Sequence, residues 1–294
     1  MTLSALTMQE KQAFEQDGYI VVKNAVDGKQ LRSLQSEIKS WVEESKLHSE
    51  PYGQPTIDGR PRFDMGVDHT ALNPTLRRIN NPSDISESYF QVMSSSKMVD
   101  MIVDLIGTNI KFHHCKINLK CPGANTTVHY HQDFAFTPHS NDDVVTALLL
   151  LDDVTEQNGC LMVVPGSHKG PMYSLYDGDQ FVGRVNDTTE QSLIKKQLPV
   201  VGAAGDVCLM HTRLAHGSAP NGSKNSRGLY ICVYTAADAI PLAKNPMPSP
   251  NEGLIVRGTG TISARMINFE VELPQQPKSA SFFTVQGQDS AAIK

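Results

Sequence analysis

The 294-residue sequence lacks several features that would assign a protein to a class at once. No uninterrupted apolar run reaches the roughly 18 residues that a membrane-spanning helix needs, so no membrane partner is expected. The first residues do not combine a charged start with an apolar stretch, so no signal peptide is predicted. Internal repeats and low-complexity tracts are also missing, which argues against a solenoid or a disordered chain.

Cysteine and charge exclude further classes. The five cysteines are scattered and form no Cys-x-x-Cys pair, which favours free thiols in a cytoplasmic protein. A formal net charge of −5 gives no basic surface, so no nucleic-acid partner is expected. A homodimer is neither predicted nor excluded by the sequence. The hydrophobic fraction of 39% is ample for a core, and the absence of a linker-like break favours a single domain.

Helix signals dominate the first part of the chain. Thr7-x-x-Glu10 has the pattern of a capping box and predicts a short helix. Asp27 is placed to cap a second helix, and a third helical region is expected over residues 86–106. Between them, residues 48–75 are rich in proline and glycine, which predicts a long functional loop.

From residue 110 the pattern changes to short strands separated by turn signals. Strands are expected at residues 110–119, 127–136, 144–151, 160–164, 198–201, 207–211 and 229–235. Asn158-Gly159 predicts a hairpin turn that leads into strand 160–164. Residues 169–195 predict a second loop, and a last strand is expected at 267–273.

This order of elements predicts a mainly β fold with N-terminal helices. Helices first and about eight short strands afterwards favour a double-stranded β-helix, a cupin-like jelly roll, with the helices packed on one sheet. Within a single domain 1–294, we expect an N-terminal helical and loop region over 1–109, a jelly-roll core over 110–238 and a C-terminal extension over 239–294.

The main candidate site is a metal site built around residue 131. In an extended strand, residues i and i+2 point to the same face, so His131 and Asp133 are expected side by side. His216, which follows an apolar strand, offers a third ligand. Two histidines and one carboxylate with the opposite positions open form the facial triad of non-haem iron(II) oxygenases.

Two other metal sites compete with this interpretation. Gly123, five further residues and His129-x-His131 match the opening of the cupin metal motif, but Ala135 and Phe136 stand where that motif needs glutamate. His129 therefore remains only as a neighbour of the metal ligands. A zinc hydrolase also uses two histidines and a carboxylate, but no His-Glu-x-x-His helix motif supports one.

Ser218 and Arg227, which follow His216 in the sequence, predict an anion site. An oxygenase that consumes 2-oxoglutarate needs a cation for the distal carboxylate, and the planar guanidinium of Arg227 suits a bidentate contact. The hydroxyl of Ser218, on the same strand face as His216, would share that carboxylate. The simpler interpretation of Arg227 is a surface charge.

The sequence resembles the phytanoyl-CoA dioxygenase (PhyH) family of Fe(II)/2-oxoglutarate oxygenases over about residues 10–238. The motifs that carry this resemblance are Phe14-x-x-x-Gly18-Tyr19-x-Val21-Val22, His131-Gln132-Asp133, Asn158-Gly159-Cys160-Leu161, Pro165-Gly166-Ser167-His168-Lys169, Gly205-Asp206, His216-Gly217-Ser218 and Arg227. The resemblance implies that His131, Asp133 and His216 hold Fe(II), and that Arg227 and Ser218 bind the far carboxylate of 2-oxoglutarate.

The resemblance implies further cosubstrate contacts. A cation from before the barrel is expected, for which Arg78 is the candidate beside its neighbour Arg77. A residue on the strand before the metal-binding pair is also expected to contact the cosubstrate, and Lys116 or Asn118 would take this place.

The implied reaction uses O₂ to hydroxylate an unactivated C–H bond of a small, secondary-metabolite or lipid-like molecule. Related halogenases have a small residue in place of the carboxylate, so Asp133 argues for hydroxylation or a related oxidation. Desaturation, epimerisation or rearrangement at the same iron, and a non-catalytic jelly-roll ligand-binding protein, are the alternatives. Loops 48–75 and 169–195 are expected to close over the site, and the expected substrate contacts are Phe134, Phe136, Tyr173 and Tyr176.

Overall fold

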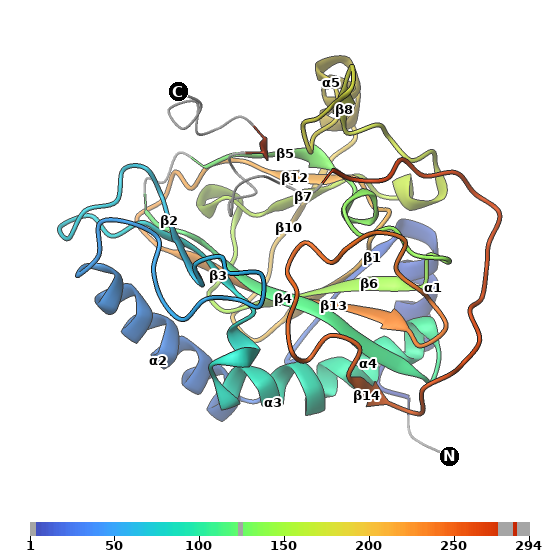
Figure 1. Ribbon diagram of the computed structural model, residues 1–294, viewed down its shortest axis with the longest axis horizontal. Helices are drawn as coiled ribbons and strands as arrows, with labels where there is room; N and C mark the ends of the chain where they lie inside the picture. Colours follow the sequence, from blue (N-terminus) through green and yellow to red (C-terminus); the bar gives the residue numbers. More distant parts are fainter. Residues whose placement is uncertain (1–3, 123–125, 276–284, 287–294) are drawn as a thin grey trace.

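The computed structural model describes residues 4–122, 126–275 and 285–286, and most of its strands form two antiparallel sheets (Figure 1). Gly123, and with it the cupin-like pattern and the turn predicted there, lies outside the described residues. The larger sheet has the order β1 (Tyr19–Val22), β11 (Val207–His211), β6 (Val144–Leu150), β13 (Arg227–Ala236), β4 (Ile110–Lys120), β3 (Leu76–Asn80) and β2 (Phe63–Met65), with β14 (Ile255–Arg257) also paired to β4.

The smaller sheet has the order β10 (Leu198–Val200), β7 (Leu161–Val163), β12 (His216–Ser218) and β5 (Val128–His131). Its inner side chains meet those of the larger sheet in one apolar cluster, in which Leu161 and Val163 pack with Leu148, Leu229 and Ile231. Because side chains alternate along a strand, the other residues of β6 and β13 point away from this cluster. Two sheets that share a core in this way form the predicted jelly roll, so the expected fold class is confirmed.

Helices cover the outer face of the larger sheet, as expected (Figure 1). The helices on this side are α1 (Met8–Asp17), α2 (Gly28–Ser45), α3 (Glu87–Ser95) and α4 (Lys97–Ile106). The hydroxyl of Tyr230 donates to the carbonyl of Tyr89 at 3.0 Å, and Tyr234 donates to Met93 at 2.7 Å, which ties α3 to β13. Within the described ranges, no helix is both long and apolar enough to cross a membrane.

The predicted helix starts are present. Thr7 and Glu10 form a reciprocal capping box at the start of α1, and the side chain of Asp27 accepts two backbone N–H groups at the start of α2. The helical region predicted over 86–106 is two helices rather than one. Ser96 has an extended backbone, which breaks the helix between α3 and α4.

Three strand predictions were wrong. The strand expected over 127–136 ends at His131, and residues 133–135 form a 3₁₀ turn instead. Asn158-Gly159 is not a hairpin turn, because β6 and β7 belong to different sheets and the chain crosses between them here. Residues 267–273 form no strand within the described ranges. Their apolar side chains pack on the core instead; Phe269, for example, lies against the cluster that contains Phe134.

Both predicted loops contain some regular structure. The loop over 48–75 includes β2. The loop over 169–195 includes a two-stranded hairpin, β8 (Tyr176–Asp177) with β9 (Gln180–Phe181), and the helix α5 (Asp187–Ile194). The remaining short turns of 3₁₀ type are Pro82–Asp84, Asp133–Ala135, Glu156–Asn158 and Ser167–Lys169.

Candidate active site

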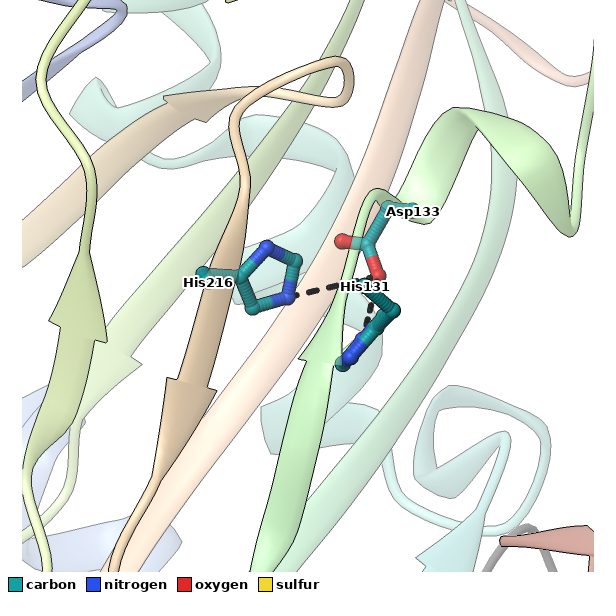
Figure 2. Close-up of side chains that lie close together, drawn as sticks. All are labelled: His131, Asp133 and His216. Carbon is teal, nitrogen blue, oxygen red and sulfur yellow. Dashed lines mark ion pairs between the residues drawn. The ribbon is translucent and has the colours of Figure 1, made fainter. Parts of the chain in front are cut away.

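Two adjacent strands of the smaller sheet bring the predicted metal ligands together. His131 on β5 and His216 on β12 are direct partners across the pair, and Asp133 follows in the 3₁₀ turn (Figure 2). The Asp133 Oδ1 atom lies 3.6 Å from Nε2 of each histidine. All three ligand atoms lie within 4.8 Å of one another. Histidine, cysteine and acidic side chains could also form metal-binding groups elsewhere. Among the residues that the structure describes, these three form the only such group of three or more.

Hydrogen bonds fix the orientation of each ligand. His131 Nδ1 lies 2.8 Å from the carbonyl oxygen of His129, and His216 Nδ1 lies 2.9 Å from that of Leu214. Carbonyl oxygens only accept, so Nδ1 carries the proton in both rings and the lone pair of Nε2 faces the site. Thr146 on β6 donates to Asp133 Oδ2 at 3.0 Å, which leaves Oδ1 toward the histidines. The three ligands are therefore held ready for a metal ion.

The electrostatics of the site favour the protonation states that a metal requires. Burial opposes ionisation of Asp133, but His216, His131 and Lys116 outweigh this effect and hold the pKa of its carboxyl far below the ordinary value. Burial, with a smaller contribution from His131, lowers the pKa of His216 to about 4. A charged carboxylate and a neutral imidazole at neutral pH are what a divalent ion binds. The residues present therefore fit iron(II).

Gly217 allows the two ligand strands to approach closely. A Cβ atom on this residue would lie 2.8 Å from the carbonyl oxygen of Val128 and 3.1 Å from the ring of Tyr130. A Cβ atom essentially never approaches a backbone oxygen to 2.8 Å, so a larger residue would push β12 away from β5. The glycine after His216 thus helps to set the distance between the two histidines.

A pair of buried cations lies in the same cavity. Arg227 and Lys120 are partners across β13 and β4, and both line the cavity with the metal ligands. Arg227 donates to the carbonyl of Gly159 at 2.7 Å, but its Nε has no partner, and neither cation has an ion pair among the described residues. Lys120 donates to the hydroxyl of Ser218 at 2.8 Å. Both cations are therefore placed to bind an anion that enters the cavity.

Burial disfavours the charged form of both cations. It lowers the pKa of Arg227 to about 10. Burial, and then the neighbouring Arg227, lowers the pKa of Lys120 to about 6. A carboxylate placed between them would reverse this destabilisation, because buried charges are stable only when they are paired. Arg227 and Ser218, the predicted ligands of the distal carboxylate, thus line the cavity, and Lys120 lies beside them.

The other predicted cosubstrate residues line the same cavity. Arg78 on β3 and Asn118 on β4 are strand partners, and Arg78 Nε donates to Asn118 Oδ1 at 3.1 Å. Lys116 lies two residues away on the same face of β4. Arg77 instead forms an ion pair with Asp64, at 2.9 Å between Nε and Oδ2. Of the two neighbouring arginines, Arg78 is therefore the one that lines the cavity.

The predicted aromatic contacts separate into two groups. Phe136 lines the cavity, and its ring packs edge-on against His131 with centroids 5.5 Å apart. Phe134 does not line it, because the 3₁₀ turn directs this fully buried ring toward Phe269. Tyr173 and Tyr176 line a second hollow, which shares Phe181 with this cavity. Neither tyrosine is among the described residues that line the cavity of the metal ligands.

His129, expected as a neighbour of the metal ligands, contributes its backbone and not its ring. Its imidazole lies 3.1 Å from the carboxylate of Glu190 on α5, whereas its carbonyl orients His131. From the two predicted loops, Arg60 and Phe181 are the described residues that line the cavity.

Sequence reasoning missed part of the cavity wall. Lys120 could have been found, because it continues the alternation of Lys116 and Asn118 along one strand face. His114, two residues before Lys116, lies on the same face. The C-terminal extension also lines the cavity, through Pro246, Met247, Pro274, Gln275 and Val285. No local sequence pattern shows that this segment returns to the site.

The fold and the site together define a class of protein. A jelly roll with two histidines, one carboxylate and a buried cation pair in one cavity is the arrangement of non-haem iron(II), 2-oxoglutarate-dependent dioxygenases. Comparison with known families leads further, since the family described as "Phytanoyl-CoA dioxygenase (PhyH)" matches residues 14–229. The chain belongs to the phytanoyl-CoA dioxygenase (PhyH) family, as its motifs predicted.

Individual relatives agree with this assignment. The probable alpha-ketoglutarate-dependent hypophosphite dioxygenase of Stutzerimonas stutzeri is 37% identical over 209 residues, which cover 68% of this chain and 71% of that one. The peroxisomal phytanoyl-CoA dioxygenase of Homo sapiens is 25% identical over 247 residues, covering 80% and 70%. The crystal structure of apo EctD from S. alaskensis has a TM-score of 0.68 at 20% identity, covering 89% and 90%. This last likeness supports the fold.

Proposed function

We propose that this dioxygenase hydroxylates an unactivated C–H bond of a small molecule, with 2-oxoglutarate bound between the metal and Arg227. The observation that carries the proposal is the shared cavity: the metal ligands line the same space as a buried cation pair, which has no acidic partner in the described ranges. His131, Asp133 and His216 would hold the iron. Arg227, Lys120 and Ser218 would hold the distal carboxylate of the cosubstrate.

The residues around the metal support this chemistry. The bound iron and 2-oxoglutarate supply the oxidising power for C–H hydroxylation. Phe136 and Phe181, with ring centroids 5.4 Å apart, form an apolar wall that excludes water from the metal side of the cavity. Arg60 and Phe181 come from the two loops expected to close over the site, which supports closure on substrate binding.

Two alternatives are less well supported. A non-catalytic binding protein has no need for a complete metal set next to a buried cation pair, and this chain has both. Desaturation, epimerisation and rearrangement use the same residues, so product analysis distinguishes them from hydroxylation. The retained carboxylate of Asp133 leaves no ligand position for a halide, which favours oxygen transfer.

The proposed setting is a reducing compartment such as the cytoplasm, with a small molecule as the substrate. Five free thiols support this setting, since all five cysteines are unpaired.

The direct test follows cosubstrate binding and turnover separately. Anaerobic addition of Fe(II) and 2-oxoglutarate to the full chain is expected to give the visible charge-transfer band of a chelated cosubstrate. Oxygen should then release succinate and CO₂. A His131→Ala variant should lose the band and bound iron, whereas His129→Ala, which removes a ring outside the metal set, should keep both. A wild-type chain that binds iron but shows neither band nor succinate would refute the proposal.

A further inference from the structure

The two histidines of the metal site lie on strands that are held in different ways. Among the described strands, β5 is the outermost of the smaller sheet and pairs with β12 on one side only. In contrast, β12 lies between β5 and β7 and is held from both sides. The backbone groups on the outer side of an edge strand need other partners. Sheet pairing alone therefore fixes the strand of His216, while the position of His131 depends on what covers the outer edge of β5.

The second predicted loop covers this outer edge, at the residue before His131. Its helix α5 lies next to β5 (Figure 1). The Tyr130 N–H donates to Glu190 Oε1 at 3.1 Å, and the Tyr130 carbonyl accepts from the N–H of Val185 at 2.9 Å. Residues 185–190 thus take the place of a neighbouring strand for Tyr130.

The Glu190 carboxylate holds two consecutive residues of β5. Besides the Tyr130 N–H, it accepts from His129 Nδ1 at 3.1 Å, and only 16% of its side chain is exposed. Hydrogen bonds to a charged acceptor are stronger than those between neutral groups. The bond to the Tyr130 N–H acts on the backbone, so it remains when the His129 ring alone is removed. Glu190 therefore fixes the backbone of β5 from outside the sheet.

This backbone position sets the orientation of His131. The carbonyl of His129 accepts from His131 Nδ1 at 2.8 Å, and this bond directs Nε2 toward Asp133. A shift of β5 would move the carbonyl, and the imidazole would turn with it. Glu190 is not among the described residues that line the cavity, so it acts on the site through β5.

We propose that Glu190 is a positioning residue of the metal centre: it fixes β5 so that the His129 carbonyl orients His131. This inference rests on the proposed function, because it takes His131 as a metal ligand. The same loop supplies Phe181 to the cavity wall. The segment that covers the cavity thus also fixes one of the ligands inside it.

The test measures metal binding by the full chain without cosubstrate, with Co(II) and anaerobic Fe(II) as the probes. The visible d–d absorption of Co(II) reports the geometry of its ligands, and competition with a chelator measures the affinity. Glu190→Ala should weaken the binding of both ions by about tenfold or more and change the Co(II) spectrum. Urea unfolding of the metal-free chain checks that the variant is folded.

Two further variants separate the reach of the Glu190 side chain from its charge. Glu190→Gln keeps an oxygen that accepts from the Tyr130 N–H, so the metal affinity should stay within about threefold of the wild type. Glu190→Asp keeps the charge but has a shorter side chain, so it should lose affinity as Glu190→Ala does. This pair decides the question even if the alanine variant does not fold. Gln191→Ala is the matched control, because Gln191 is the next residue on α5 and is exposed, and it should bind both ions as the wild type does.

Two outcomes would overturn the inference and leave the proposed function standing. If Glu190→Ala and Glu190→Asp bind metal with the affinity and spectrum of the wild type, Glu190 does not position His131, whatever its effect on stability. If Glu190→Gln binds as weakly as Glu190→Ala, the charge of Glu190 acts rather than its position. If the wild type binds neither ion, or if His131→Ala binds them equally well, the proposed function fails and the inference fails with it.

Discussion

Thr146 on the larger sheet donates a 3.0 Å hydrogen bond to Oδ2 of Asp133, and this leaves Oδ1 as the oxygen that faces both histidines. Asp133 lies in a turn next to the smaller sheet, so the hydrogen bond connects the two sheets at the metal site. A carboxylate in a turn is free to rotate about its side-chain bonds unless a partner holds it. Thr146 supplies that partner.

Replacement of Thr146 by valine should therefore weaken iron binding. Loss of a hydrogen bond to a metal ligand typically costs about 10- to 100-fold in metal affinity, and we expect a loss in this range, measured by competition with a chelator. Thr235→Val is the matched control, because Thr235 is equally buried but its hydroxyl has no hydrogen-bond partner among the residues that the structure describes. That variant should bind iron normally. Equal iron affinity in the two variants would show that Thr146 does not orient Asp133.

Gly217→Ala should separate the two histidines. The added methyl group would meet the carbonyl oxygen of Val128, so β12 must shift away from β5. We expect a loss of roughly 1–3 kcal/mol in stability, the usual range for overpacking, together with weaker iron binding. Urea unfolding and iron titration measure the two effects. An alanine variant that loses stability but binds iron normally would show that the strand spacing is not critical.

Arg227→Met should lower stability only when the cosubstrate is bound. Without 2-oxoglutarate, the loss of the bond to Gly159 is offset by removal of a buried cation that has no ion pair within the described part of the chain, so the unfolding free energy should change little. With Fe(II) and 2-oxoglutarate, the wild type should gain stability from the bound ligand and the variant should not. Thermal unfolding under anaerobic conditions measures both states.

Lys120→Met should raise the KM for 2-oxoglutarate by about tenfold, in steady-state succinate assays.

The buried histidines make the metal-free protein sensitive to acid. His139 and His113 lie with ring centroids 5.0 Å apart, outside the cavity. Burial is the main reason that the pKa of His139 falls to about 4 and that of His113 falls well below its ordinary value. Both rings stay neutral in the folded state, whereas the unfolded chain takes up protons near pH 6.5. Stability is therefore complete above about pH 6.5 and falls as the pH drops toward 4.

Each such ring contributes a slope of up to about 1.4 kcal/mol per pH unit. A His139→Gln variant cannot titrate, so its unfolding free energy should fall less steeply over this range. Urea unfolding of metal-free protein between about pH 4.5 and 7.5 measures the two slopes. Identical slopes would show that His139 does not contribute to acid sensitivity.

The sequence predicted the metal ligands through a geometry that is only partly right. His131 and Asp133 were expected side by side on a strand, but the strand ends between them and the turn brings the carboxylate back to the histidines. Gln132 explains why the strand ends there. Its side chain is fully buried and forms hydrogen bonds with the backbone of Arg213, Pro171 and Tyr173, which holds two distant loops against the turn. Contacts with distant loops of this kind leave no local pattern in the sequence.

Alternation along strands explains both what was found and what was missed. The even-numbered residues of β4 from His114 to Lys120 line the cavity, and the family resemblance had named two of them, Lys116 and Asn118. Phe134 does not line the cavity, because the 3₁₀ turn directs its ring toward Phe269. Met247 and Gln275 were missed for a different reason, since their position depends on where the chain returns after leaving the jelly roll.

The C-terminal segment returns to the cavity after the jelly roll is complete. The metal ligands and this part of the cavity wall therefore come from different parts of the sequence. The family match ends at residue 229, and every metal ligand lies before that point. Pro246, Met247, Pro274 and Gln275, which line the cavity, lie after it. The part of the chain that holds the metal and the part that completes the cavity wall are thus two separate segments, one after the other in the sequence. Exchange of the block after residue 239 between relatives is therefore a route to a chimera with altered substrate preference and an unchanged iron centre.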